Sequence, residues 1–262
     1  MTNLRVYGAA PFRVAVIHGG PGAAGEMAPV ARRLAGAHGV LEPIQTKPSV
    51  QGQVEELHNI LLSEATLPVV LVGFSWGAWL TILLASKSPE LVRKIVLVSS
   101  GGFNEASAKG LNDRRLIRLR DEEKAEFQAA VAGLNDPEIR NKDALLSALG
   151  HLTSRADAYD SIDDADEPDP LPVSAEIFRR VWSEAAEMRR TGALLRAVRS
   201  LACPVVALHG DSDPHLAADV FGPLSANLAD FRFVLLAKCG HTPWRERQAS
   251  DKFYEVLLAE IA

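Results

Sequence analysis

The sequence is poor in three features that are typical of other classes of protein: cysteine, basic charge and long apolar runs. It has two cysteines in 262 residues and a formal net charge of −5 at pH 7. This acidic balance gives no reason to expect nucleic acid or an anionic membrane as a partner. Every apolar run ends well short of the roughly 18–20 residues of a membrane span. Residues 1–13 lack the order of a secretory signal, so we expect a cytoplasmic protein.

The two cysteines, Cys203 and Cys239, predict neither a disulfide nor a metal site. We expect them at opposite edges of one sheet, beyond the roughly 4.4–6.8 Å Cα separation that a disulfide needs. Neither belongs to a C-x-x-C motif, so a zinc or redox role is not expected. The phosphate-binding patterns G-x-x-x-x-G-K-[ST] and G-x-G-x-x-G are also missing. We expect no cofactor and no metal.

The most informative stretch of the sequence is residues 67–80, which predicts a strand, a turn and a helix in succession. Residues 69–72 are apolar without alternation, which is typical of a strand buried on both faces of a parallel sheet. The pattern G-x-S-x-G follows at residues 73–77, with Ser75 at its centre. Small residues two positions before and after a serine let a strand and a helix approach closely around a strained turn. The simpler interpretation is a glycine-rich turn that contains a serine.

Strands and helices alternate along the chain, which predicts an α/β fold with a mainly parallel sheet, flanked by helices. The predicted strands cover residues 4–7, 13–17, 39–41, 69–72, 94–98, 204–208 and 231–236, and the predicted core helices cover residues 26–35, 54–62, 78–85, 217–228 and 253–261. We expect a core of residues 1–102 and 201–262. Residues 103–200 contain no convincing strand and are expected to form an inserted helical cap.

The expected cap is rich in charge and predicts helices near residues 112–133, 143–152 and 174–200. Residues 157–169 hold seven acidic side chains, with prolines near their end. We interpret this segment as a solvated loop. The alternative is an acidic rim that attracts a cationic group of a substrate.

Three side chains follow predicted strands in the order serine, acid, histidine: Ser75, Asp213 and His241. In open parallel sheets the loops at the carboxyl edge converge. A serine hydroxyl needs a base, a histidine can serve, and a carboxylate orients that histidine and stabilises its cation. Asp211 is a second candidate for the acid, but the spacing from Gly210 favours Asp213.

The segment HGGPG at residues 18–22 predicts the remaining part of such a site. A tetrahedral oxyanion needs two preorganised donors, and backbone N–H groups suit this role. We expect them from Gly20 and Trp76, with His18 bracing the loop. Gly19 and Trp182 are expected to contact the substrate, whereas Trp79 belongs to the core. The remaining histidines are expected to be structural or on the surface: His38, His58, His151, His209 and His215.

Together, HGGPG at residues 18–22, GFSWG at 73–77, HGDSD at 209–213 and CGHTPW at 239–244 resemble the α/β-hydrolase superfamily. The resemblance implies catalytic roles for Ser75, Asp213 and His241. HGGPG and S-W-G look like those of the proline iminopeptidases. That group typically has a glycine where Ala78 stands, and a longer region before its HGGPG. Related loops also occur in esterases and C–C bond hydrolases.

The first hypothesis is therefore a serine hydrolase that cleaves a small-molecule ester or amide through an acyl-enzyme on Ser75. The second is an aminopeptidase of the proline iminopeptidase type, acting on a short peptide. Acyl transfer and lyase chemistry remain open, whereas a haloalkane dehalogenase would need an aspartate at position 75. The third hypothesis is a non-catalytic ligand-binding module. The oligomeric state is not predicted.

Overall fold

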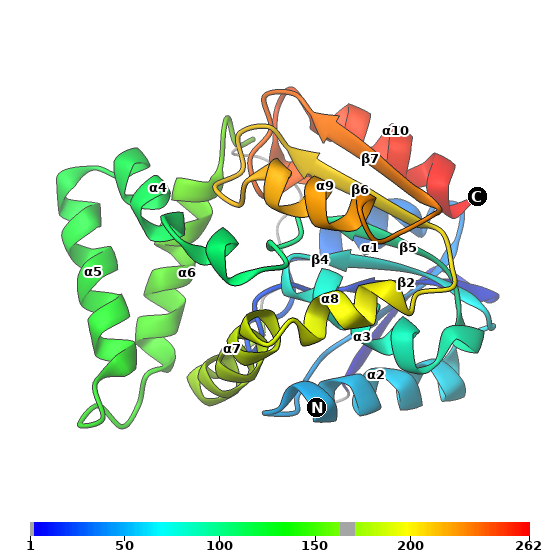
Figure 1. Ribbon diagram of the computed structural model, residues 1–262, viewed down its shortest axis with the longest axis horizontal. Coiled ribbons are helices and arrows are strands. Elements are labelled where there is room, and N and C mark those ends of the chain that lie inside the picture. The colour runs from blue at the N-terminus through cyan, green and yellow to red at the C-terminus, as the bar shows by residue number, and fades with distance from the viewer. Residues whose placement is uncertain (1–2, 163–170) are drawn as a thin grey trace.

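The computed structural model describes residues 3–162 and 171–262, and the described chain is built on one seven-stranded sheet (Figure 1). The strand order is β1-β3-β2-β4-β5-β6-β7. Only β1 is antiparallel to its neighbour β3; the other pairs are parallel. The strands are β1 (Leu4–Tyr7), β2 (Phe12–Ile17), β3 (Gly39–Pro43), β4 (Val69–Phe74), β5 (Val92–Val98), β6 (Val205–Gly210) and β7 (Phe231–Leu236).

The central strands are apolar because helices cover both faces of the sheet. All residues of β4 are buried, and alternate residues of that strand belong to two separate clusters. One face packs against α2 (Val50–Glu64), α3 (Trp76–Lys87) and α9 (Ala217–Ser225). The other face packs against α1 (Ala28–Leu34) and α10 (Ser250–Ile261). The α/β-hydrolase fold expected from the sequence is confirmed.

The segment between β5 and β6, residues 103–200, is called the insertion below. Its helices are α4 (Leu111–Arg118), α5 (Asp121–Asn135), α6 (Asp143–Asp157), α7 (Ala175–Arg190) and α8 (Ala193–Arg199). Two of the helical stretches predicted here are each interrupted. The backbone is extended at Leu119 and Arg120, between α4 and α5, and Gly192 is left-handed with φ +71° before α8. These local turns let each helix fold back on the previous one.

The insertion contacts the core in two different ways (Figure 1). Helices α4, α5 and α6 form a lobe beside the sheet, with one small apolar cluster of their own and a second that they share with the start of α7. Helices α7 and α8 instead bury side chains in the main core: Val181, Ala185, Leu194 and Val198. The second group therefore ties the insertion to helix α3, which follows Ser75.

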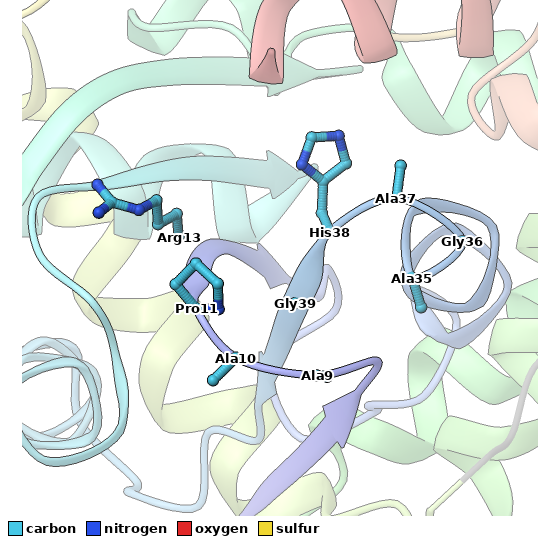
Figure 2. Close-up of a pocket in the computed structure, with 9 residues that line it drawn as sticks. All are labelled: Ala9, Ala10, Pro11, Arg13, Ala35, Gly36, Ala37, His38 and Gly39. Atoms are coloured by element: carbon cyan, nitrogen blue, oxygen red, sulfur yellow. The ribbon is translucent and has the colours of Figure 1, made fainter.

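Parallel pairing brings the carboxyl ends of β2, β4, β6 and β7 to the same edge of the sheet. Residues 18–22, Ser75, Asp213 and His241 all follow these ends. A surface pocket of about 320 Å³ lies at the opposite edge, between residues 9–13 and 35–39 (Figure 2). Its lining consists mostly of alanine, glycine and proline, with Arg13 and His38, and it lies away from the residues at the carboxyl edge.

Both cysteines are free, as the sequence predicts. None of the helices in the described ranges is long and apolar enough to cross a membrane.

Candidate active site

Ser75 occupies a strained turn between β4 and α3. Its φ of 52° is unusual for a residue with a side chain, and its N–H donates to the Val98 carbonyl oxygen at 3.0 Å. A Cβ atom at Gly73 would lie 2.8 Å from the Ala78 Cα, and one at Gly77 would lie 2.6 Å from the His18 carbonyl oxygen. Only glycine fits at both positions, which is the steric reason for the G-x-S-x-G spacing.

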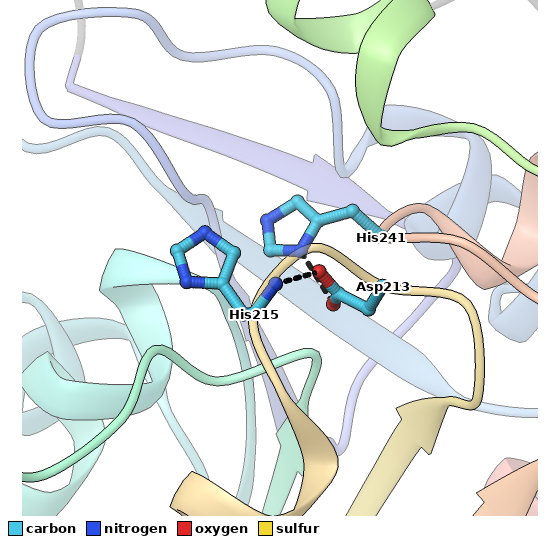
Figure 3. A group of neighbouring side chains, drawn as sticks. All are labelled: Asp213, His215 and His241. Carbon is cyan, nitrogen blue, oxygen red and sulfur yellow. Dashed lines mark hydrogen bonds and ion pairs between the residues drawn. The ribbon is translucent and has the colours of Figure 1, made fainter. Parts of the chain in front are cut away.

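The structure brings Ser75, His241 and Asp213 into one chain of hydrogen bonds. The Ser75 hydroxyl donates to His241 Nε2, with 3.1 Å between the atoms. The His241 Nδ1–H donates to Asp213 Oδ2 at 2.7 Å (Figure 3). Asp213 and His241 are buried, whereas Ser75 is partly exposed. The residues are 166 and 28 positions apart in sequence, so only the fold unites them.

Asp213 is held in its ionised form. Burial alone would raise the pKa of this carboxyl, but the facing His241 and His209 outweigh burial and hold it well below its usual range. The His215 backbone N–H also donates to Asp213 Oδ1 at 2.8 Å. Asp211 points elsewhere, because its carboxylate accepts the Cys239 N–H at 3.2 Å. The geometry therefore agrees with Asp213, and not Asp211, as the partner of His241.

The ionised Asp213 in turn changes the basicity of His241. Burial by itself lowers the pKa of this imidazole, but the charge and hydrogen bond of Asp213 outweigh it. The net effect raises the pKa of His241 above the ordinary histidine value. Such a histidine is a stronger base toward the Ser75 hydroxyl.

His215 lies closer to this site than the sequence predicts. Its ring stacks on that of His241, with 4.9 Å between the centroids (Figure 3). Arg115 Nη2 donates toward its Nε2 at 3.4 Å. Burial lowers the pKa of His215, so this imidazole stays neutral beside the base. The sequence carries no signal for this, because His215 belongs to no motif.

Asp213, His215 and His241 are the one group in the described ranges with at least three metal-type donors close enough to share an ion. Their donors are already engaged, however. Asp213 accepts from His241 and from the His215 N–H, and His215 Nε2 faces the Arg115 guanidinium. A positive guanidinium beside the group also disfavours a cation. The donor set therefore fits an acid–base pair better than a metal centre.

The glycine loop, residues 18–22, follows β2, which pairs with β4, the strand that precedes Ser75. His18 is fully buried and donates its Nδ1–H to the Gly19 carbonyl oxygen at 2.8 Å, while its Nε2 accepts the Gln45 N–H at 3.2 Å. Burial lowers the pKa of His18 to about 4, so the ring is a neutral brace. Within the described ranges, neither the Gly20 N–H nor the Trp76 N–H donates to another residue. Both remain available to a ligand.

The two residues expected to contact the substrate differ in their surroundings. The Gly19 N–H already donates to Glu26 Oε1 at 2.6 Å, so it is not free to bind a substrate. Trp182 lies on α7, half-buried, and its ring meets the edges of Trp76 and Trp79 at 5.9 and 5.8 Å between centroids. The Trp76 indole itself is buried and donates to Gln53 Oε1 at 2.9 Å.

The insertion reaches the site through contacts that the sequence does not predict. Asp157 forms a two-point ion pair with Arg115, with both N–O distances at 2.7 Å. Its carbonyl oxygen accepts the His241 N–H at 2.9 Å. The expected solvated loop is therefore wrong for Asp157, which ends α6 and is buried by its ion pair. Residues 163–170 of that acidic segment lie outside the described residues.

The chain belongs to the alpha/beta hydrolase family, whose model matches residues 14–256. It is 24% identical over 208 residues to a pimeloyl-(acyl-carrier protein) methyl ester esterase of Pectobacterium carotovorum subsp. carotovorum (strain PC1). That alignment covers 79% of this chain and 75% of the esterase. The family and this relative support hydrolase activity.

Two solved structures illustrate how widely this fold is used. A proline iminopeptidase of Mycobacterium smegmatis is similar with a TM-score of 0.62 and 17% identity, covering 98% of this chain and 93% of that one. A meta-cleavage product hydrolase of Pseudomonas fluorescens IP01 is similar with a TM-score of 0.66 and 14% identity, covering 98% and 92%. At these identities the similarity describes the fold, which hosts several chemistries.

Proposed function

We propose that this protein is a serine hydrolase that cleaves a small-molecule carboxylic ester or amide through an acyl-enzyme on Ser75. The observation that carries the proposal is the continuous chain of hydrogen bonds from Ser75 through His241 to Asp213. Its members have the separate roles that nucleophilic catalysis needs: a nucleophile, a base with a raised pKa, and an ionised acid.

In the proposed reaction the Ser75 oxygen bonds to the substrate carbonyl carbon while its proton passes to His241 Nε2. The N–H groups of Gly20 and Trp76 stabilise the oxyanion. His241 then gives the proton to the departing alcohol or amine as its bond to the carbon breaks. Water repeats these steps on the acyl-enzyme and releases the acid. Asp213 stabilises the imidazolium while it carries the proton.

We also propose that residues 103–200 act as a helical cap on a core of residues 1–102 and 201–262. The contacts of α6 with the His241 loop, and of Trp182 with Trp76, support this division. The cap would then set the substrate, with Trp182 beside the acyl group. A small apolar acyl group suits these aromatic surroundings.

An aminopeptidase reading requires a free carboxylate for the substrate amine. In the described part of the insertion, Asp157 lies beside the His241 loop, and Arg115 forms an ion pair with its carboxylate. The pairing of this carboxylate supports an ester or a neutral amide as the proposed substrate. The pimeloyl-(acyl-carrier protein) methyl ester esterase is an ester hydrolase by name, which points in the same direction.

Hydrolysis of p-nitrophenyl esters of increasing chain length tests the proposal, with proline-β-naphthylamide as the aminopeptidase probe. We expect ester turnover, labelling of Ser75 by a fluorophosphonate, and loss of both in Ser75→Ala by at least about 10³-fold. Ser86→Ala, on the same helix α3, is the matched control and should behave as wild type. A folded protein that no such probe labels would contradict serine catalysis and favour a ligand-binding module.

A further inference from the structure

A half-buried carboxyl group, that of Glu26, lies against the glycine loop and has no part in the mechanism above. Glu26 precedes α1, seven residues after Gly19. Its Oε1 atom accepts the Gly19 N–H at 2.6 Å, a short distance for an N–H donor. A Cβ atom at Gly19 would lie 2.9 Å from this oxygen and 2.9 Å from the Phe74 ring. The carboxyl group is thus packed closely against the loop.

Because peptide bonds are planar, the hydrogen bond of Glu26 affects the direction of the Gly20 N–H. The Gly19 carbonyl and the Gly20 N–H belong to one peptide unit and point in opposite directions in its trans form. His18 holds that carbonyl through Nδ1. Glu26 holds the preceding peptide unit through the Gly19 N–H. With both units held, the two backbone torsions of Gly19 are set, and so is the direction of the Gly20 N–H.

We propose that Glu26 is a positioning residue for the oxyanion hole, which accepts the Gly19 N–H and thereby fixes the direction of the Gly20 donor. The inference rests on the proposed function, since it assigns Glu26 a role in stabilising the same oxyanion. Glycine at positions 19 and 20 lets the loop approach the reacting carbonyl, but leaves it free to turn. Glu26 removes that freedom before the substrate binds.

The surroundings of Glu26 also change the ionisation of its carboxyl group. Burial raises the pKa of this carboxyl to about 7, although its own N–H and that of Gly19 favour the ionised form. Glu42 raises this pKa further, and His241 opposes the rise. A pKa above the unfolded value means that stability falls as pH rises from about 4.5 to 7. At pH 8 a carboxyl here is less favourable for folding than a neutral acceptor.

Two substitutions separate the hydrogen bond from the charge. Glu26→Ala removes the acceptor and should lower kcat about 10–100-fold with less than about a threefold change in KM. Glu26→Gln keeps an acceptor oxygen and should restore kcat to within about threefold of wild type. It should also raise the unfolding midpoint at pH 8 and leave it unchanged at pH 4. Fluorophosphonate labelling of Ser75 should slow in Glu26→Ala in parallel with kcat.

Glu184→Ala is the matched control, because Glu184 Oε2 accepts a backbone N–H of the same kind, that of Val50, at 2.7 Å between α7 and α2. It should leave kcat unchanged. A wild-type kcat in Glu26→Ala, a loss confined to KM, or a Glu26→Gln variant as inactive as Glu26→Ala would overturn the proposal. If wild-type Ser75 is neither labelled nor active, the proposed function fails instead, which is a different result.

Discussion

At the scale of single residues, the proposed reaction depends on the protonation of His241. The base must be neutral to accept the Ser75 proton, so activity should fall as pH falls through its pKa. Asp213 raises that pKa despite burial of the imidazole. The acid limb of kcat/KM should therefore have its midpoint above the ordinary histidine value of about 6.5.

Replacing Asp213 by asparagine tests this dependence. Asp213→Asn removes the negative charge that favours the imidazolium, so the acid limb should move to lower pH. The kcat value should also fall about 10³–10⁴-fold, because the amide can stabilise the wrong tautomer of His241. The measurement is the pH profile of ester hydrolysis for the variant and wild type. An acid limb at the wild-type position would show that another group sets it.

The neighbouring histidines show how differently one residue type can be used. His18 is neutral and braces the glycine loop, with its pKa lowered to about 4 by burial. His209 is also buried and donates its Nε2–H to the His215 carbonyl oxygen at 2.6 Å. Only His241 combines an ionised partner with a nucleophile. Their surroundings, and not their residue type, separate one base from two structural groups.

At the scale of elements, the turn from β4 to α3 depends on close approach of backbone. The Gly77 position touches the end of β2, where the carbonyl groups of Ile17 and His18 lie. An added Cβ would overlap backbone atoms of the central sheet, and shifting those closely packed atoms would cost free energy of folding. The G-x-S-x-G pattern is therefore a packing requirement of the fold, whatever the chemistry of Ser75.

We expect Gly77→Ala to destabilise the protein by about 2–4 kcal/mol and to slow labelling of Ser75. Gly150→Ala is the matched control, since Gly150 lies within α6 and a Cβ there meets no atom within 4 Å. The control should stabilise the protein by about 0.5–1 kcal/mol, because alanine favours a helix. Denaturant unfolding of both variants gives these values. Equal stabilities would contradict the packing argument.

At the scale of the whole molecule, Glu246 joins the insertion to the loop that carries His241. This carboxylate is buried and accepts three backbone N–H groups: those of Tyr159 at 2.9 Å, Asp160 at 2.8 Å and Gly240 at 2.9 Å. Gly240 precedes His241, and Tyr159 follows the end of α6. One side chain thus couples the position of the base to that of the insertion.

Replacing Glu246 by glutamine should weaken this junction. An amide offers one acceptor oxygen and turns a donor toward N–H groups, so we expect a loss of about 2–4 kcal/mol in unfolding free energy. Amide exchange at residues 158–162 should accelerate, and kcat should fall. Glu255→Gln is the control, because Glu255 is exposed and its ion-pair partner among the described residues is Lys252 on the same helix. Unchanged exchange in Glu246→Gln would contradict the coupling.

The strands of the core and the turn at Ser75 can be predicted from the sequence, because they depend on residues that are close together in the chain. Apolar runs such as residues 69–72 predict buried strands, and two glycines around Ser75 predict the strained turn. Parallel strands then bring Ser75, Asp213 and His241 to one edge. The sequence predicts the helices of the insertion but not the points at which two of them are interrupted. A turn such as that at Leu119 has no strong sequence signal.

What only the tertiary structure decided are the partners of buried polar groups. Arg115 meets Asp157 across 42 positions, and Glu246 meets Tyr159 across 87. A charged side chain is usually solvated at the surface, and the sequence predicts this for Asp157. Burial becomes possible when a distant group of opposite charge pairs with it. Long-range packing likewise places His215 against His241 and Glu26 against the glycine loop. The sequence determines which segments form buried strands and where the chain turns, because those preferences are local. Long-range packing determines which charged side chains can be buried, because each needs a partner that is distant in sequence.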